Sequence, residues 1–178
     1  YRKMSQGNKP VGQLMVVSVL INNIGATALI DTGCSARVLL DPAFCEKASL
    51  CQKPATVTKN VVLGDGESKV SIDKQVNDLT ISVKNYSSKE KGCGVMKLGG
   101  YDLILGLPWL QTLESKADKA HLKWSFTDNV IKTKVKGQRV VLQGLAPEVL
   151  AAPRYSEKYL KQMCSRKQNR RTELDGSK

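Results

Sequence analysis

The sequence predicts an all-β domain with one or two short helices, in a chain of 178 residues whose length suits one domain plus extensions. Apolar runs of strand length recur along the chain and are separated by turns rich in Asn, Asp and Gly. Signals for the start of a helix stand at Pro42 and Pro108, since proline suits the first helical turn. No apolar run reaches the length that a bilayer requires, so no membrane contact is expected.

The first half of the chain is expected to form a hairpin, a short helix and a segment that runs outwards from the domain. Asp41 before Pro42 is typical of an N-cap, which places the helix directly after it. The expected elements are a strand at Leu14–Ile21, an Asn-rich turn at Asn22–Gly25, a strand ending at Asp31, a helix at Ala43–Lys47 and an outward-running segment at Cys51–Lys59.

The second half is expected to consist of further strands around one more helix. Alternation of apolar and polar residues predicts a half-buried strand at Val76–Lys84, and the polar residues after it predict an exposed turn at Asn85–Lys91. The remaining expected elements are strands at Val95–Leu98 and Ile104–Gly106, a short helix around Trp109, and strands at Leu122–Phe126, Asn129–Thr133 and Arg139–Leu142.

The strand that ends at Asp31 leads directly into the tripeptide Asp31-Thr32-Gly33. The carboxylate is a candidate acid and base, the hydroxyl can fix the loop, and the glycine has no Cβ where a substrate must come close. The simpler interpretation is a strand followed by a turn, because Asp and Gly are both common turn residues.

This stretch resembles the active-site loop of retropepsin-like aspartic proteases, in which two hydrophobic residues precede Asp-Thr/Ser-Gly-x-Ser. In that family a second apolar strand ending in glycine crosses the acid loop, and Ile104–Gly106 fits this pattern. Leu63–Gly66 resembles the flap of gypsy-type retrotransposon proteases, although an ordinary surface hairpin is the alternative. The resemblance covers residues 11–144 and implies a retropepsin-like fold, closed and barrel-like, with a flap hairpin over the site.

The resemblance also implies a homodimer. The chemistry of the family needs two carboxylates, whereas this chain has a single Asp-Thr-Gly, so each of two subunits is expected to supply Asp31 across a two-fold axis. Some viral members place an arginine just after the second glycine, where it helps to hold the dimer. Here Leu107 and Pro108 follow Gly106, so the dimer contacts are expected to differ.

The implied reaction is the hydrolysis of a peptide bond without a metal or cofactor. Two Asp31 carboxylates about 3 Å apart would share one proton, so that one accepts a proton from water while the other donates to the scissile carbonyl. The implied catalytic residues are Asp31, Thr32 and Gly33, and the implied substrate-binding residues are Ser35, Ala36, Gly64, Asp65, Gly66 and Ile104. The implied substrate is a retrotransposon Gag-Pol polyprotein.

A second class of function stays open at this point. A host can retain such a domain as a dimerisation or peptide-binding module with little proteolysis. The intact Asp31-Thr32-Gly33 favours catalysis over this alternative.

The five cysteines indicate a reducing compartment, because their number is odd and no Cys-x-x-Cys spacing occurs. We therefore expect a cytoplasmic protein, in a retrotransposon particle or also in the nucleus. Cys34 and His121 are the alternative source of a nucleophile, but a small buried cysteine is the preferred interpretation.

The formal charge of +12 is concentrated partly in the last 25 residues, where eight cations and three acids give 8 − 3 = +5. We expect a loose leader at residues 1–10 and a basic tail at 145–178, with a short helix at Ser156–Met163. A solvated linker is the preferred interpretation of the tail. The alternative is a weak, nonspecific and salt-sensitive contact with nucleic acid.

Overall fold

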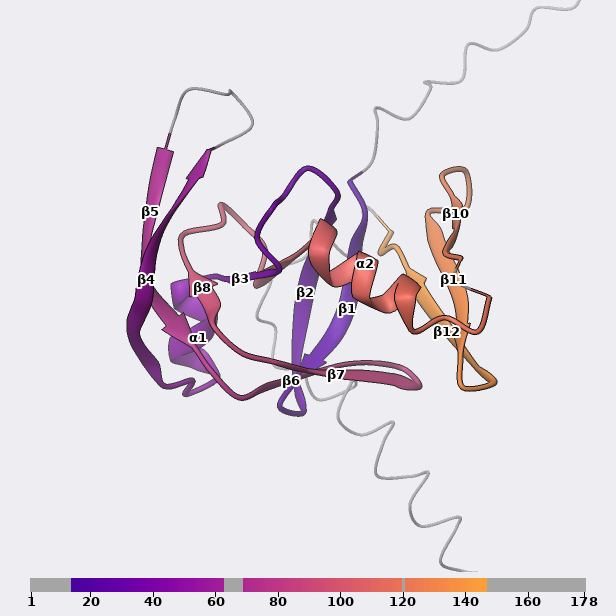
Figure 1. Ribbon diagram of the computed structural model, residues 1–178, viewed down its shortest axis with the longest axis horizontal. Coiled ribbons are helices and arrows are strands. Elements are labelled where there is room, and N and C mark those ends of the chain that lie inside the picture. The colour runs from indigo at the N-terminus through magenta and orange to yellow at the C-terminus, as the bar shows by residue number, and fades with distance from the viewer. Residues whose placement is uncertain (1–13, 63–68, 120, 147–178) are drawn as a thin grey trace, which may run out of the picture.

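The computed structural model describes residues 14–62, 69–119 and 121–146, and these form a mostly β fold with two short helices (Figure 1). The leader, the predicted flap tip at Gly64, Asp65 and Gly66, and nearly all of the basic tail lie outside the described residues. Neither described helix has the length and apolar character to span a bilayer, the longer having nine residues.

The described strands fall into a nine-stranded and a three-stranded sheet. The nine-stranded sheet has the order β4-β5-β8-β3-β9-β2-β1-β6-β7, and the smaller one has the order β10-β11-β12. The elements are β1 (Val16–Ile21), β2 (Ile24–Asp31), β3 (Val38–Leu40), α1 (Pro42–Lys47), β4 (Gln52–Val62), β5 (Lys69–Val76), β6 (Leu79–Val83), β7 (Tyr86–Glu90), β8 (Cys93–Val95), β9 (Leu103–Gly106), α2 (Leu107–Ser115), β10 (Lys123–Ser125), β11 (Val130–Val135) and β12 (Gln138–Gln143).

The hairpin β1–β2 delivers the acid loop, as the sequence predicts. The two strands pair antiparallel from Val16↔Leu29 to Ile21↔Ile24. Asn22 and Asn23 between them have φ angles of 47° and 72°, and a two-residue hairpin turn of this kind requires positive φ at both positions. The expected Asn-rich turn is therefore confirmed.

Strand β9 lies between β2 and β3 and fixes where the acid loop runs. It is parallel to β2, with Asp31 opposite Gly106, and antiparallel to β3, with Val38 opposite Leu105. The chain therefore leaves β2 on one side of β9, crosses the end of β9, and returns along its other side.

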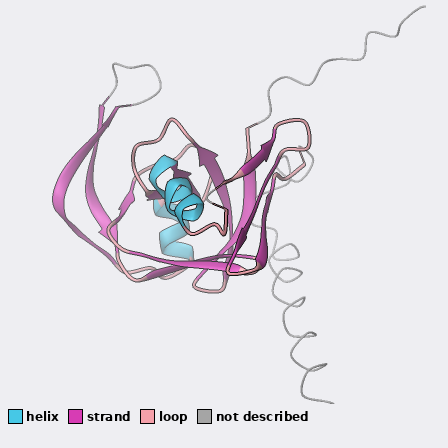
Figure 2. Cartoon of the chain, turned by 45° about the vertical axis from the view of Figure 1, so that its right-hand side comes forward, coloured by secondary structure: helices cyan, strands magenta, loops and turns pink. Residues whose placement is uncertain are grey.

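The two helices pack inside the curved sheet, as Figure 2 shows. Asp41 caps α1 by accepting a hydrogen bond from the Ala43 amide at 2.9 Å, and α2 begins at Leu107 with Pro108 in its first turn. Trp109 and Phe44 are the largest of the fully buried side chains. Both predicted helices are therefore present, and each contributes its apolar face to the core.

The three-stranded sheet joins the same core through one face. Ile131, Val140 and Leu142 on this face are buried in the cluster that also contains Trp109. A bridge between Val17 and Gly144 connects the end of the smaller sheet to β1. The three expected C-terminal strands are thus confirmed.

The prediction of an exposed turn in the middle of the chain is wrong. Asn85–Lys91 is not an exposed turn, because it contains strand β7, in which Tyr86, Ser88 and Glu90 are buried. The sequence of β7 is largely polar, but its buried polar groups find partners on distant elements.

The expected strands near β7 also have shifted boundaries. The segment Cys51–Lys59, expected only to run outwards, lies from Gln52 onwards in the long strand β4, which pairs with β5. A turn at Asn77 and Asp78 divides the predicted strand Val76–Lys84, and Asp78 has a φ of 59°. The strand expected at Val95–Leu98 lies earlier, at Cys93–Val95.

Candidate active site

Asp31 is the last residue of β2, and the tight turn after it holds its carboxylate. The Gly33 amide donates a hydrogen bond to Asp31 Oδ1 at 2.8 Å, and the Cys34 amide donates to the Asp31 carbonyl at 3.3 Å. In the part of the chain that the structure describes, Oδ2 has no hydrogen-bond partner. Asp31 is half-buried, whereas Thr32 and Gly33 are exposed. The loop thus holds one carboxylate oxygen, and the other oxygen has no partner among the described residues.

The loop after Asp31 lies directly on the end of β9. The Gly106 amide donates to the Arg37 carbonyl at 3.1 Å, and the Leu107 amide donates to the Cys34 carbonyl at 3.0 Å. A Cβ on Gly106 would lie 1.9 Å from the Ala36 carbonyl oxygen, so only glycine allows this approach. The backbone of β9 therefore supports the acid loop from behind.

A cavity of about 360 Å³ lies beside this loop. Ser35 and Ala36, both predicted to bind substrate, line one side of it, whereas Ile104 is not among its lining residues. Ile104 is half-buried in the middle of β9, opposite Leu29 and Leu39. The other walls come from the β4–β5 hairpin and from the start of β8, with Val57, Val61, Ile72, Gln75, Gly92 and Gly94.

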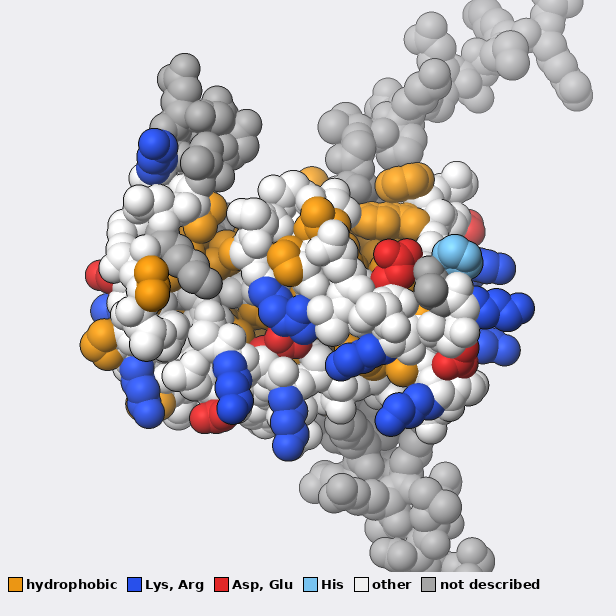
Figure 3. Space-filling model, viewed as in Figure 1, with side chains coloured by type: hydrophobic (Ala, Val, Ile, Leu, Met, Phe, Trp, Pro, Cys, Tyr) orange, Lys and Arg blue, Asp and Glu red, His pale blue; other side chains and the backbone are white. Residues whose placement is uncertain are grey.

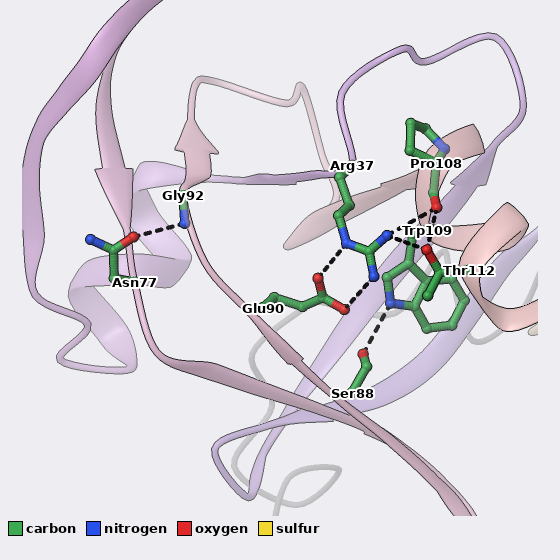
Figure 4. A network of polar contacts seen from close by, with 8 residues as sticks. All are labelled: Arg37, Asn77, Ser88, Glu90, Gly92, Pro108, Trp109 and Thr112. Atoms are coloured by element: carbon green, nitrogen blue, oxygen red, sulfur yellow. Dashed lines mark hydrogen bonds and ion pairs between the residues drawn. The ribbon is translucent and has the colours of Figure 1, made fainter. Parts of the chain in front are cut away.

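Arg37 forms a polar network that the sequence does not indicate (Figure 4). Its guanidinium donates to both carboxylate oxygens of Glu90, at 2.6 and 3.2 Å, and Glu90 is only 2% exposed. One further nitrogen donates to Thr112 Oγ1 at 2.6 Å and to the Pro108 carbonyl at 3.0 Å. Beside this network, Trp109 Nε1 donates to Ser88 Oγ at 3.1 Å.

This network joins the end of the acid loop to β7 and α2. Arg37 and Glu90 are 53 residues apart in the chain. No motif or local periodicity connects them, so no signal in the sequence could have identified the pair.

The PEG10/RTL1 protease domain profile matches residues 27–137 of this chain. The matched segment is more than half of the chain and includes the acid loop, the cavity walls and the Arg37 network. The chain belongs to the PEG10/RTL1 family of retropepsin-like aspartic protease domains. No curated protein sequence matches the chain.

Solved structures similar to this PEG10/RTL1-type domain include two retropepsin relatives. The retroviral protease-like domain of Ddi1 from Leishmania major is 13% identical, and the match covers 75% of this chain and 95% of that one with a TM-score of 0.48. A retropepsin-like aspartic protease from Rickettsia conorii is 16% identical, with coverage of 71% and 84% and a TM-score of 0.41.

A buried carboxylate stabilises the strand pair beneath the site of the PEG10/RTL1-type domain. Asp102 precedes β9 and accepts hydrogen bonds from the Thr27 amide at 2.8 Å and from Thr27 Oγ1 at 2.9 Å. The Asp102 amide donates to the Thr27 carbonyl at 3.1 Å. These bonds join β2 to the start of β9, so Asp102 stabilises the register that places Asp31 beside Gly106.

Cys34 is a poor nucleophile in this PEG10/RTL1-type domain. Burial raises the pKa of its thiol, which disfavours the thiolate that nucleophilic attack requires. Its Sγ lies 3.6 Å from the Ala36 carbonyl oxygen, to which it donates a weak hydrogen bond, whereas His121 is exposed beside the smaller sheet. The geometry therefore favours the interpretation of Cys34 as a partly buried packing residue.

Proposed function

We propose that the domain is an aspartic endopeptidase in which water is activated between two Asp31 carboxylates, one from each subunit. The proposal rests on the hydrogen bonding of the Asp31 carboxylate. The Gly33 amide fixes Oδ1, and Oδ2 is unbonded among the described residues. This is the arrangement that a carboxylate needs to exchange a proton with a bound water. Asp31 itself does not line the cavity of about 360 Å³, but Ser35 and Ala36 of the same loop do.

The dimer supplies the second carboxylate, because retropepsin-like proteases generally act as dimers and this chain holds a single acid loop. Two carboxylates across the axis share one proton, since both cannot ionise at close range. The ionised Asp31 accepts a proton from water, and its protonated counterpart donates to the scissile carbonyl. Thr32 holds the two loops together across the axis, and Gly33 gives the substrate backbone room to approach.

The proposed substrate is an extended segment of polypeptide. Ser35 and Ala36 line the cavity at the acid loop, and the β4–β5 hairpin forms the opposite wall. The flap contacts of Gly64, Asp65 and Gly66 stay a prediction from the sequence, because these residues lie outside the described ranges. Ile104 supports the site from within β9. A retrotransposon Gag-Pol polyprotein, processed in the cytoplasm or in a particle, fits the retrotransposon origin of the family.

One observation also favours a second function. The PEG10/RTL1 family derives from retrotransposons that hosts have domesticated, so a host-retained module for dimerisation or peptide binding is the competing proposal. The two proposals differ in whether Asp31 turns over substrate.

The deciding experiment compares wild type with Asp31→Asn on an unfolded protein substrate, with and without pepstatin. The asparagine side chain keeps an oxygen for the Gly33 amide, so we expect the variant to fold while it loses cleavage. Pepstatin-sensitive cleavage that disappears in the variant supports the protease. The absence of cleavage, at concentrations where sedimentation shows a dimer, supports the binding module instead.

A further inference from the structure

The outer face of the β10–β12 sheet carries four cations at neighbouring positions. Lys123 on β10 is paired with Lys132 on β11, and Lys134 on β11 is paired with Arg139 on β12. Directly paired residues, and residues two apart in one strand, point to the same side of a sheet, so the four side chains share one face. We call this surface the lysine face. Figure 3 shows Lys and Arg side chains gathered over this part of the molecule.

The requirements of folding do not account for the lysine face. Like charges directly opposite each other destabilise a pair of strands, and here two such pairs are adjacent. Within the described ranges, none of the four cations has a carboxylate at salt-bridge distance. The charge is therefore available to an external anion.

One acidic side chain, Asp118, also lines this surface, but its carboxylate already accepts two hydrogen bonds from the backbone. Asp118 accepts hydrogen bonds from the Lys136 amide at 2.7 Å and from the Gly137 amide at 2.8 Å, which holds the β11–β12 turn. A cavity of about 550 Å³ lies over the sheet here, and its lining also includes Lys119 and His121. The surface is thus a concave site with a strong excess of positive charge.

We propose that the lysine face binds the phosphate backbone of single-stranded nucleic acid. Lysine is depleted in protein–protein interfaces, whereas lysines in a groove are the usual contacts to phosphates. A second copy of this chain is not a suitable ligand for the lysine face, because the chain itself carries a charge of +12. This site is formed by residues of the folded domain, and none of them belongs to the Asp31 loop or to the sequence of the basic tail.

An exposed aromatic stack lies at the end of β10, on the opposite side of this strand from the lysine face, because Trp124 is paired with the core residue Ile131. Phe126 follows β10, is 82% exposed, and stacks on Trp124 with ring centroids 5.2 Å apart and an interplanar angle of 22°. Exposing a large aromatic ring to water is unfavourable, and such rings are the platforms on which unpaired bases stack. Because β10 is the edge strand of the described three-stranded sheet, a flexible single strand held by the lysine face can pass over this edge and stack a base on Phe126.

The test measures binding of a fluorescein-labelled oligouridine of about 20 nucleotides to the full chain by fluorescence anisotropy over a series of salt concentrations. We expect Lys132→Gln/Lys134→Gln to weaken binding about tenfold near 0.1 M salt and to reduce the slope of log K against log salt by about 1.4. Its melting temperature should equal or exceed that of wild type, because the substitutions remove like-charge repulsion.

The matched control is Lys53→Gln/Lys74→Gln, which removes the same charge from exposed positions on β4 and β5. These strands lie on the opposite side of the molecule from β10–β12 (Figure 1). The control should retain the affinity and salt slope of wild type. Equal weakening in both double variants would overturn the proposal, because it would reflect net charge alone.

Two further measurements separate the ligand classes. Phe126→Ser should weaken oligouridine binding without changing the salt slope, since it removes stacking and no charge, and unchanged affinity would overturn the assignment of a base platform. Polyglutamate of matched length should compete poorly. Equal competition by polyglutamate would overturn the nucleic-acid assignment in favour of an acidic protein partner.

Discussion

Gly106 decides whether the acid loop can rest on β9. Its Cα lies so close to the loop that an added Cβ would meet two backbone carbonyl oxygens, of Ala36 at 1.9 Å and of Cys34 at 2.7 Å. Backbone atoms that form hydrogen bonds cannot move aside as the end of a flexible side chain can. The Leu107 amide already bonds one of these oxygens.

We therefore expect Gly106→Ala to lower the free energy of unfolding by about 3 kcal/mol or more, measured by urea denaturation. Gly137→Ala is the control, because Gly137 has a φ of 76° and open space around its Cα, so it carries only the conformational cost of about 1 kcal/mol. Equal losses in the two variants would contradict the close packing at Gly106.

Two buried thiols should make the free energy of unfolding fall at alkaline pH. Burial raises the pKa of Cys45 to about 11 and of Cys93 to about 12. A raised pKa means that the folded state favours the neutral thiol. This stabilisation is complete below the ordinary pKa of 9.0 and is lost as the pH rises toward the folded-state values.

Cys93→Ala should accordingly reduce the loss of unfolding free energy between pH 8 and pH 10.5, although its stability at pH 7 is lower because a buried side chain is shortened. Cys51→Ala is the matched control, because it removes an exposed thiol instead of a buried one. A slope in Cys93→Ala as steep as in wild type would show that this thiol does not contribute.

At the scale of elements, the Arg37 network joins three parts of the fold. Arg37 closes the acid loop, Glu90 ends β7, and Thr112 lies in α2. The Glu90 side chain is 2% exposed and that of Arg37 is 36% exposed, so the pair is partly screened by water. Loss of either partner leaves the other charge unpaired in a largely apolar surrounding.

We expect Glu90→Gln to cost about 2 kcal/mol of unfolding free energy, since the amide cannot accept both guanidinium bonds. Arg37→Met should cost a similar amount. In a double-mutant cycle the two losses should be coupled by about 1 kcal/mol or more, because the double variant contains no unpaired charge. Additive losses would show that the ion pair itself contributes nothing.

At the scale of the whole molecule, one chain supplies half of the proposed active site. Asp31 is the only acid in the Asp-Thr-Gly loop, and the proposed mechanism needs a second carboxylate from a partner. Activity then depends on how chains pair, which distinguishes a dimeric enzyme from a monomeric one.

Adding an equal amount of Asp31→Asn chain to wild type should lower cleavage to about one half, since random pairing places half of the wild-type chains in mixed dimers. The measurement is the initial rate on a peptide after equilibration, with bovine albumin as the inert control for added protein. An unchanged rate would show that one subunit is sufficient.

Much of the fold and the local structure of the acid loop could be predicted because their signals are local. The Asn-rich turn, the two proline-marked helices, and Asp31-Thr32-Gly33 are each specified by neighbouring residues. Strand β7 could not be predicted in the same way. Its alternating buried residues include Ser88 and Glu90, which are polar and are tolerated inside only because Trp109 and Arg37 meet them.

The sequence by itself determined the acid loop, the strands that carry it, and the glycine strand that crosses it, because turn chemistry and apolar periodicity act over a few residues. Tertiary structure alone decided which distant groups meet. It paired Arg37 with Glu90, and it placed Lys123 opposite Lys132 and Lys134 opposite Arg139. The physical reason is that ion pairs and charged faces depend on strand register and sheet order, and these follow from burial of the whole core.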